Sequence, residues 1–333
     1  MSSVEVFTDA GLRDGAERRT AGIAGLGCAL PEGSIHTDDV AARVGVEPEW
    51  ILRRTGIAAR RRLAPGATLT DLATHAAQAA LADAGLAGVD LDVLLVATAS
   101  ADMVMPAAAP LVAKRVGATH AMTWDVNLAC TGFLAGLEQG AALIESGRAT
   151  NVLVIAAEAL SRVTDHEDRK TAALFGDGAG AAVLTAGGAL RLGQSILRAD
   201  GDDDGALVVD HDDRLVRMDG QVVFQRAVAA MERCCTEVLA AAGVDVADID
   251  LVVPHQANAR ITLSLSERLG VAPERVVDAI REVGNTGAAS IPLALEQARR
   301  EGRLPEQGLL LLTAFGAGFA SGAVLIEIGD AGA

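Results

Sequence analysis

Apolar residues along this 333-residue chain follow two patterns, one with helical spacing and one with short continuous runs. Thr68–Ala84 carries its apolar residues on one helical face and is followed by Gly85, which predicts a helix that ends at this glycine. Helical spacing also predicts helices at Val40–Arg54, Thr131–Glu145 and Ala288–Arg300. Continuous apolar runs predict buried strands at Ala21–Leu30, Asp92–Ala99, Asn151–Ala157 and Leu309–Ala314.

One helix–strand unit occurs twice. Leu81–Val96 reads LADAGLAGVDLDVLLV and Leu239–Val253 reads LAAAGVDVADIDLVV, so each has a helix end, a glycine, an acidic turn and an apolar strand. We therefore expect an α/β protein made of two duplicated halves, residues 21–187 and 188–333, after a flexible N-terminal extension of residues 1–20.

The segment Gly308–Ile326 has no charged residue over 19 positions, which is the length of a membrane span. Four glycines and two hydroxyl residues interrupt it, so the pattern favours a strand, a turn and a second strand. The polar N-terminus lacks the apolar stretch of a signal peptide. These features predict no membrane association and a cytoplasmic location.

Composition narrows the functional classes. Half of the residues are hydrophobic, the net charge is −16, there is no tyrosine and there are two tryptophans. Acidic charge and scarce aromatic residues argue against nucleic-acid binding. The four cysteines, at positions 28, 130, 234 and 235, form no C-x-x-C pair and no metal-ligand spacing, so we expect no metal site and a reducing environment.

Cys130 lies where an extended segment meets the predicted helix Thr131–Glu145. The positive end of a helix and its unpaired N–H groups lower the pKa of a thiol, which predicts a nucleophilic thiolate. A small buried core residue is the competing interpretation, because free cysteines are often buried.

Three further polar segments are candidates for the same site. His255 follows an apolar strand within the cluster Pro254–Asn258, at a position where α/β proteins place their chemistry. Asn285 lies in the tight loop Gly284–Gly287, and Phe315–Gly318 allows backbone N–H groups to approach a ligand as an oxyanion hole requires. Phe175–Gly180 lacks the lysine of a phosphate loop, so we interpret its glycines as close packing.

Cysteine, histidine and asparagine in this chain order also serve papain-like peptidases. The Cys-Gly-Ser-Cys-Trp context of those peptidases is absent here, and the chain is a glycine-rich α/β protein. A peptidase is therefore disfavoured.

From Ala21 to Ile328 the sequence resembles β-ketoacyl-acyl carrier protein synthase III, a family of thiolase-fold condensing enzymes in fatty-acid and polyketide synthesis. The matching motifs are Glu49-Trp50-Ile51, Arg54–Ile57, Ala129-Cys130 with Gly132-Phe133, Phe175–Ala181, Pro254–Asn258 with Arg260, Gly284–Thr286 with Ala288–Ser290, and Phe315–Gly318. The resemblance implies a thiolase-like fold of two duplicated halves in five layers, α-β-α-β-α, and a homodimer.

The resemblance also implies the reaction. Cys130 takes an acyl group from acyl-CoA, and His255 and Asn285 then stabilise the enolate formed when malonyl-carrier protein loses CO2. The backbone N–H groups of Cys130 and Ala317 form the oxyanion hole, and no cofactor is required. The partners are acyl-CoA and acyl carrier protein.

The remaining binding residues are carried over position by position. Trp50 and Arg169 match a clamp for the CoA adenine. The pantetheine tunnel corresponds to Arg54, Gly220, Phe224, Ala257 and Asn258; the acyl pocket corresponds to Met105 and Phe315; and carrier docking corresponds to Arg260 and Arg268.

The sequence departs from the family in places. Gln225 and Glu267 stand where fatty-acid members often have lysines, which predicts weaker or more specialised docking of an acidic carrier. Met105 replaces a usual aromatic residue, which predicts a different acyl preference. Acyl transfer without condensation is the main alternative, and a non-catalytic partner subunit is a second. The combination of Cys130, His255 and Asn285 favours condensation.

Overall fold

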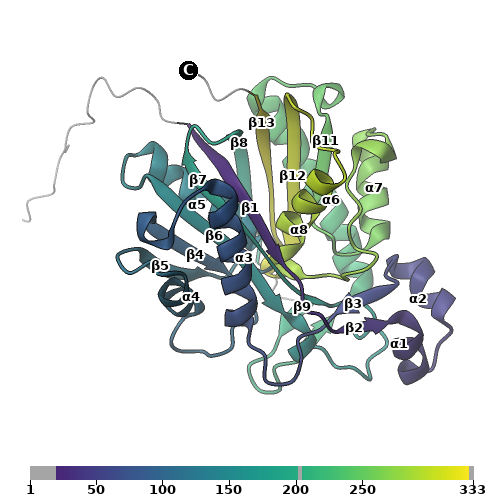
Figure 1. The fold of residues 1–333 in the computed structure, drawn as a ribbon. Helices are drawn as coiled ribbons and strands as arrows, with labels where there is room; N and C mark the ends of the chain where they lie inside the picture. Colours follow the sequence, from purple (N-terminus) through teal and green to yellow (C-terminus); the bar gives the residue numbers. More distant parts are fainter. Residues whose placement is uncertain (1–19, 202–204, 330–333) are drawn as a thin grey trace, which may run out of the picture.

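The computed structural model describes residues 20–201 and 205–329, and nine of the strands in this part of the chain form one sheet (Figure 1). The predicted extension 1–20 lies outside the described residues, apart from Thr20. The sheet contains, in chain order, β1 (Ala21–Ala29), β4 (Val93–Ala97), β5 (Met122–Val126), β6 (Asn151–Ala159), β7 (Asp177–Ala186), β8 (Leu190–Ala199), β11 (Leu251–Pro254), β12 (Gly308–Gly316) and β13 (Ala320–Ile328). Their spatial order is β11-β12-β13-β8-β1-β7-β6-β4-β5.

The sheet consists of two strand groups that repeat one pattern. From the centre outward, β1-β7-β6-β4 and β8-β13-β12-β11 each make two antiparallel pairings and then one parallel pairing. Only the first group is extended further, by β5. The five-layer arrangement that the resemblance implies has a separate sheet in each half. In the structure, a short pairing of β1 with β8, at Gly22↔Arg191 and Ile23↔Leu190, joins the two groups.

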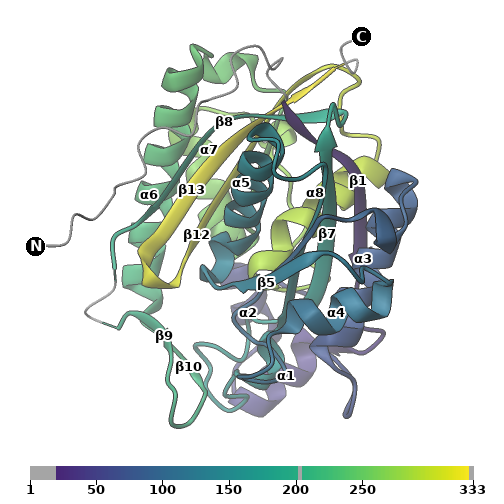
Figure 2. The same cartoon turned by 90° about the vertical axis from the view of Figure 1, so that its left-hand side faces the viewer.

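The helices occupy equivalent places in the two groups. The pairs are α3 (Leu69–Ala84) with α6 (Gly220–Ala242), and α5 (Gly132–Glu145) with α8 (Ser290–Arg300); α4 (Ala108–Val116) and α7 (Ala259–Leu269) complete the covering (Figure 2). The helices α3 and α6 pack on β1 and β13, respectively, and each contacts only its own strand group extensively. By contrast, α5 and α8 contact strands of both groups. The side chains of α5 and α8 therefore belong to a core that the two groups share.

Alternation along the strands explains how each strand serves two cores. In β4, Val93 and Leu95 face the shared core, whereas Leu94 and Val96 pack with α3 and α4. In β11, Val252 packs with α6 in a separate cluster. These strands are buried on both faces, which is why their sequences are continuously apolar.

The sequence repeat corresponds to a repeated structure. Gly85 ends α3 and Gly243 ends α6, with positive φ angles of 67° and 68°. Each glycine is followed by a 3₁₀ turn, Gly88–Asp90 or Val246–Asp248, and then by β4 or β11. Glycine adopts this left-handed conformation without steric cost, so both helices end where the sequence predicted.

The prediction of one helix over Val40–Arg54 is wrong. The structure has α1 (Thr37–Val44) and α2 (Pro48–Thr55), because Gly45 ends the first in a left-handed conformation and Pro48 begins the second. Two small antiparallel sheets of two strands each lie near α1 and α2: β2 (Ser34–His36) pairs with β3 (Ala59–Arg61), and β9 (Leu207–Val209) pairs with β10 (Val216–Met218).

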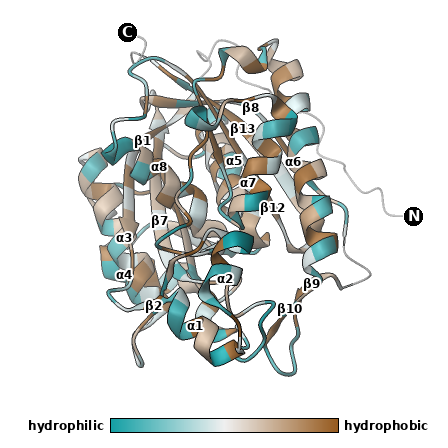
Figure 3. Ribbon diagram, turned by 90° about the vertical axis from the view of Figure 1, so that its right-hand side faces the viewer, coloured by the Kyte–Doolittle hydropathy of each residue, from teal (hydrophilic) through white to brown (hydrophobic). Residues whose placement is uncertain are grey.

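The uncharged segment Gly308–Ile326 is confirmed as two strands, β12 and β13, joined by the turn Ala317–Phe319. Within the described residues, no helix has the length and apolar character needed to cross a membrane. Figure 3 shows that α1, α2 and α6 instead alternate hydrophilic and hydrophobic bands, as expected of helices with one face toward solvent.

Candidate active site

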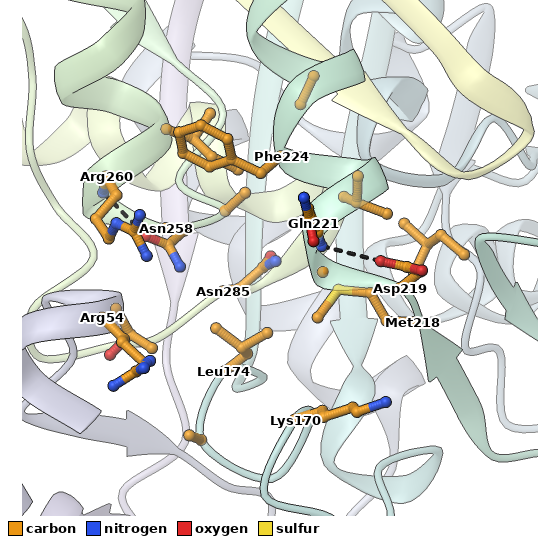
Figure 4. Close-up of a pocket in the computed structure, with 18 of the residues that line it drawn as sticks. Arg54, Lys170, Leu174, Met218, Asp219, Gln221, Phe224, Asn258, Arg260 and Asn285 are labelled. Carbon is orange, nitrogen blue, oxygen red and sulfur yellow. Dashed lines mark hydrogen bonds between the residues drawn. The ribbon is translucent and has the colours of Figure 1, made fainter. Parts of the chain in front are cut away.

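A cavity of about 750 Å³ contains Cys130, His255 and Asn285 in its lining. These three residues come from distant parts of the sequence, at the start of α5, the end of β11 and the loop before α8. In Figure 4, Asn285 lies between Arg54 and Asn258 on one side and Gln221 and Asp219 on the other. The fold therefore brings together the three side chains that the sequence selected.

Cys130 lies in the 3₁₀ turn Ala129–Thr131, directly before α5. Ala129 has a φ of 44°, a left-handed conformation that is uncommon for a residue with a side chain. A Cβ atom at Gly316 would lie 2.7 Å from the backbone N of Cys130, so the end of β12 can approach the cysteine this closely only as glycine. A strained turn and a glycine contact thus fix the position of Cys130.

The predicted lowering of the Cys130 pKa is wrong. Burial, and to a smaller extent the nearby carboxylate of Glu158, raise the pKa of the thiol to about 12. The backbone N–H of the cysteine acts in the opposite direction, but its effect is smaller. The uncharged thiol is therefore the resting form at neutral pH.

Glu158 is an active-site neighbour that sequence analysis missed. It is 1% exposed on β6 and accepts hydrogen bonds from the hydroxyl of Ser100, the backbone N–H of Ala99 at 3.2 Å and the backbone N–H of Ala288. Burial raises its pKa to about 7 despite these donors. A single acid in the apolar run 151–160 was the available signal.

His255 is 2% exposed and follows β11, with its backbone N–H donating to Thr313 O at 2.7 Å. Its Nδ1 lies 2.6 Å from Ser290 Oγ. Burial lowers the pKa of the imidazole to about 4, so the ring is neutral at physiological pH. Gln256 fixes the same segment by donating to Pro254 O at 2.7 Å and to Val277 O at 3.1 Å.

Asn285 is held at both its backbone and its side chain. Its N–H donates to Leu174 O at 2.9 Å, and its carbonyl accepts from Gly176 N at 2.9 Å. The side-chain Oδ1 accepts from Gly287 N at 2.9 Å, which leaves the NH2 group to donate to a ligand. The predicted tight loop is confirmed by the positive φ values of Gly284 and Gly287, 74° and 55°.

The glycines of Phe175–Gly180 serve close packing, as predicted. A Cβ atom at Gly176 would lie 2.2 Å from Val283 O, and one at Gly180 would lie 2.6 Å from Pro292 Cβ. This glycine segment therefore packs directly against the loop that carries Asn285 and against α8.

Most of the predicted binding residues also line the cavity, namely Trp50, Arg54, Arg169, Gly220, Phe224, Ala257, Asn258, Arg260 and Phe315. The guanidinium of Arg54 lies 4.1 Å from the centre of the Trp50 ring, so it covers one face of this ring. The cavity also includes Lys170, Met218 and Met231, which sequence reasoning did not select.

Three predicted residues lie outside this lining. Met105 is 86% exposed and does not border the cavity of its own chain. Arg268 pairs with Glu232 at 2.7 Å. Ala317 is in the turn between β12 and β13 and directly follows Gly316, the residue that lies against the backbone of Cys130.

The fold is α/β, and its cavity is lined by a cysteine, a histidine and an amide, that is, by a nucleophile and two possible hydrogen-bond donors. The family described as 3-oxoacyl-[acyl-carrier-protein] synthase III matches residues 124–201, and the family of its C-terminal region matches residues 239–328. The β-ketoacyl-[acyl-carrier-protein] synthase III of Bordetella petrii is 42% identical over 319 residues, which cover 92% of this chain and 97% of that protein. The chain belongs to the 3-oxoacyl-[acyl-carrier-protein] synthase III family.

Two solved structures are similar to this chain in both fold and sequence. The crystal structure of 3-oxoacyl-[acyl-carrier-protein] synthase III from Aquifex aeolicus VF5 is 41% identical with a TM-score of 0.89, covering 92% of this chain and 99% of that one. The priming β-ketosynthase from the R1128 polyketide biosynthetic pathway is 35% identical with a TM-score of 0.90, covering 97% and 100% of the two chains.

Proposed function

We propose that this protein catalyses the decarboxylative condensation of an acyl-CoA with malonyl-acyl carrier protein, giving 3-oxoacyl-acyl carrier protein and starting fatty-acid or polyketide synthesis. The observation that supports it most is the presence of Cys130, His255 and Asn285 in one cavity of about 750 Å³. The cavity has the size of small-molecule and cofactor sites.

In the first step, the sulfur of Cys130 attacks the thioester carbonyl of acyl-CoA. A bond forms between this sulfur and the acyl carbon, the bond to the CoA sulfur breaks, and the thiol proton leaves with CoA. The carbonyl oxygen becomes negative in between, and the N–H groups of Cys130 and Ala317 form its oxyanion hole. The close contact of Gly316 with Cys130 N supports this pairing, because it places the two backbone segments side by side.

In the second step, malonyl-carrier protein replaces CoA. The bond to the carboxylate breaks, CO2 leaves, and the electron pair moves to the thioester oxygen as an enolate. His255 and Asn285 donate hydrogen bonds to this oxygen, which in a buried site would otherwise be very costly to charge. The enolate carbon then attacks the acyl group on Cys130, the carbon–sulfur bond breaks, and the cysteine leaves as a thiolate that takes up a proton from solvent to restore the thiol. The step uses no cofactor.

The mouth of the cavity suits CoA and a carrier arm. We assign the adenine to Trp50 and Arg169, and the pantetheine to Arg54, Gly220, Phe224, Ala257 and Asn258, all of which line the cavity. Arg54 moves off the Trp50 ring when adenine stacks there. Arg260 is the stronger carrier-docking residue, since Glu232 already neutralises Arg268.

We infer a homodimer with a cytoplasmic location. Met103, Val104 and Met105 form an exposed apolar segment, which a partner subunit would bury. In this dimer Met105 completes the acyl pocket of the other subunit, opposite Phe315. The contacts of α5 and α8 with both strand groups support a thiolase-like α-β-α-β-α layering and two duplicated halves, 21–187 and 188–333.

Intact-protein mass spectrometry tests the proposal. The protein is exposed to a panel of acyl-CoAs and then to malonyl-carrier protein. We expect an acyl adduct on the enzyme, followed by a carrier product two carbons longer than the loaded acyl group. The Cys130→Ala variant should form no adduct; an undiminished adduct would refute the nucleophile. An adduct that ignores malonyl-carrier and discharges to another acceptor would favour simple acyl transfer.

A further inference from the structure

His255 can serve the reaction in two ways, and the position of one proton decides between them. A buried neutral imidazole carries hydrogen on one nitrogen and a lone pair on the other. Hydrogen on Nε2 makes this atom a donor, whereas hydrogen on Nδ1 makes Nε2 an acceptor that would repel an enolate oxygen. The partner of Nδ1 therefore sets the chemistry of the other ring nitrogen.

That partner is the hydroxyl of Ser290, 2.6 Å from Nδ1. Ser290 is 2% exposed, so water does not freely supply alternative partners. Its Oγ also accepts the backbone N–H of Gln256 at 3.3 Å. A backbone N–H can only donate, so one lone pair of the serine oxygen is already used.

Counting the remaining hydrogens favours one arrangement. If the hydroxyl donates to Nδ1, both His255 Nδ1 and Ser290 Oγ are satisfied. If Nδ1–H donated to Oγ, the hydroxyl hydrogen would need another acceptor, and within residues 20–201 and 205–329 Ser290 Oγ has only His255 and Gln256 as hydrogen-bond partners. A buried unsatisfied hydroxyl is unfavourable.

The position of Ser290 at the start of a helix also favours a hydrogen bond from its hydroxyl to Nδ1 of His255. Ser290 is the first residue of the eleven-residue helix α8. The positive end of a helix dipole stabilises a lone pair on a nearby atom and disfavours a bound proton there. Nδ1 lies 2.6 Å from the hydroxyl of this first residue, so it is best suited to accept.

We propose that Ser290 is a positioning residue that fixes His255 as the Nε2–H tautomer and thereby makes it a hydrogen-bond donor to the reacting thioester oxygen. Asn285 is oriented in the same manner, since Gly287 N–H occupies its Oδ1 and leaves its NH2 group to donate. The single segment Gly287–Ser290 thus sets the polarity of both donors. The catalytic consequence rests on the condensation proposed above.

The direct test is NMR spectroscopy of the full-length protein labelled with ¹⁵N-histidine. The spectrum of His255→Asn identifies the His255 signals among six histidines. In the wild-type protein we expect hydrogen on Nε2 and a lone pair on Nδ1. In Ser290→Ala we expect a mixture of tautomers, and in Ser290→Thr, which keeps the hydroxyl, recovery of the wild-type pattern. Hydrogen on Nδ1 in the wild-type protein would overturn the inference.

The kinetic test separates the two reaction steps. Ser290→Ala should lower kcat for condensation about 10- to 100-fold, the usual range for loss of an orienting partner, with KM for malonyl-carrier little changed. Acylation of Cys130 should stay within about threefold of the wild type. Ser266→Ala is the matched control, because it removes another buried serine hydroxyl. This hydroxyl donates to Val271 O at a distance of 2.7 Å, and Ser266 does not line the cavity.

These outcomes distinguish a failure of the proposed role of Ser290 from a failure of the proposed condensation activity. Equal loss of acylation and condensation in Ser290→Ala, or loss matched by Ser266→Ala, would reduce Ser290 to a structural role. A wild-type protein that forms the acyl adduct but never condenses would overturn the proposed function, and the NMR spectrum would still decide the tautomer.

Discussion

The two helix starts that enter the cavity are equivalent in the repeated topology but differ in what they contribute. Before α5, a 3₁₀ turn presents Cys130; before α8, a 3₁₀ turn follows Asn285. The first has Ala129 in a strained left-handed conformation and a buried carboxylate, Glu158, nearby. The second uses glycines for its tight turns and presents neutral groups. A duplicated framework has thus been specialised into a nucleophilic side and a hydrogen-bond-donating side.

The segments that follow the equivalent strands β4 and β11 differ in a similar way. Beyond β4, Ala99 and Ser100 donate to Glu158 and hold a buried acid. Beyond β11, the equivalent strand of the second group, His255 itself lines the cavity. Equivalent positions therefore supply support in one group and a reacting side chain in the other.

Asn285→Asp should produce the largest effect, a large difference between its loss of condensation rate and its loss of Cys130 acylation rate. A carboxylate in place of the amide removes a donor and adds negative charge where the enolate forms, so condensation should fall about 100- to 1,000-fold. Acylation of Cys130 should change far less. Single-turnover mass spectrometry of each step measures both rates, and an equal loss in both would argue against the division between the sides.

His255→Asn should change how acid affects stability. The pKa of His255 falls from about 6.5 to about 4 on folding, so the unfolded chain binds more protons between these values and the folded state loses stability as pH falls through this window. The loss from this group reaches about 3 kcal/mol at pH 4. Urea unfolding between pH 7 and pH 4 should therefore show a shallower decline in the variant. Parallel declines would contradict a buried neutral histidine.

Glu158→Gln should have a smaller effect, an increase in the reactivity of Cys130. At pH 8 the Glu158 carboxylate is ionised and raises the pKa of Cys130, so its neutralisation should increase the thiolate fraction. Alkylation of Cys130 by iodoacetamide should become several-fold faster, after subtraction of the rate in Cys130→Ala. A slower or unchanged rate would show that Glu158 acts on this cysteine only through packing.

Sequence patterns predicted the features that depend on neighbours along the chain. The end of α3 at Gly85 and the repeated turn after α6 follow from local glycine and aspartate spacing. The selection of His255 and Asn285 came from strand ends and glycine loops, which are also local signals.

Properties set by distant residues were not predictable in this way. The helix start suggested a low thiol pKa at Cys130, but Glu158 and the surrounding burial reverse its direction. Pairing of β1 with β8 could not be expected from either strand alone.

The contact between Gly316 and Cys130 has a consequence for biosynthesis. Cys130 is translated well before β12, which ends at Gly316. A chain that folds from its N-terminus during synthesis can form the Cys130 turn early, but it lacks the neighbouring backbone segment until β12 has emerged. A nascent chain on the ribosome therefore carries the thiol without the complete cavity around it.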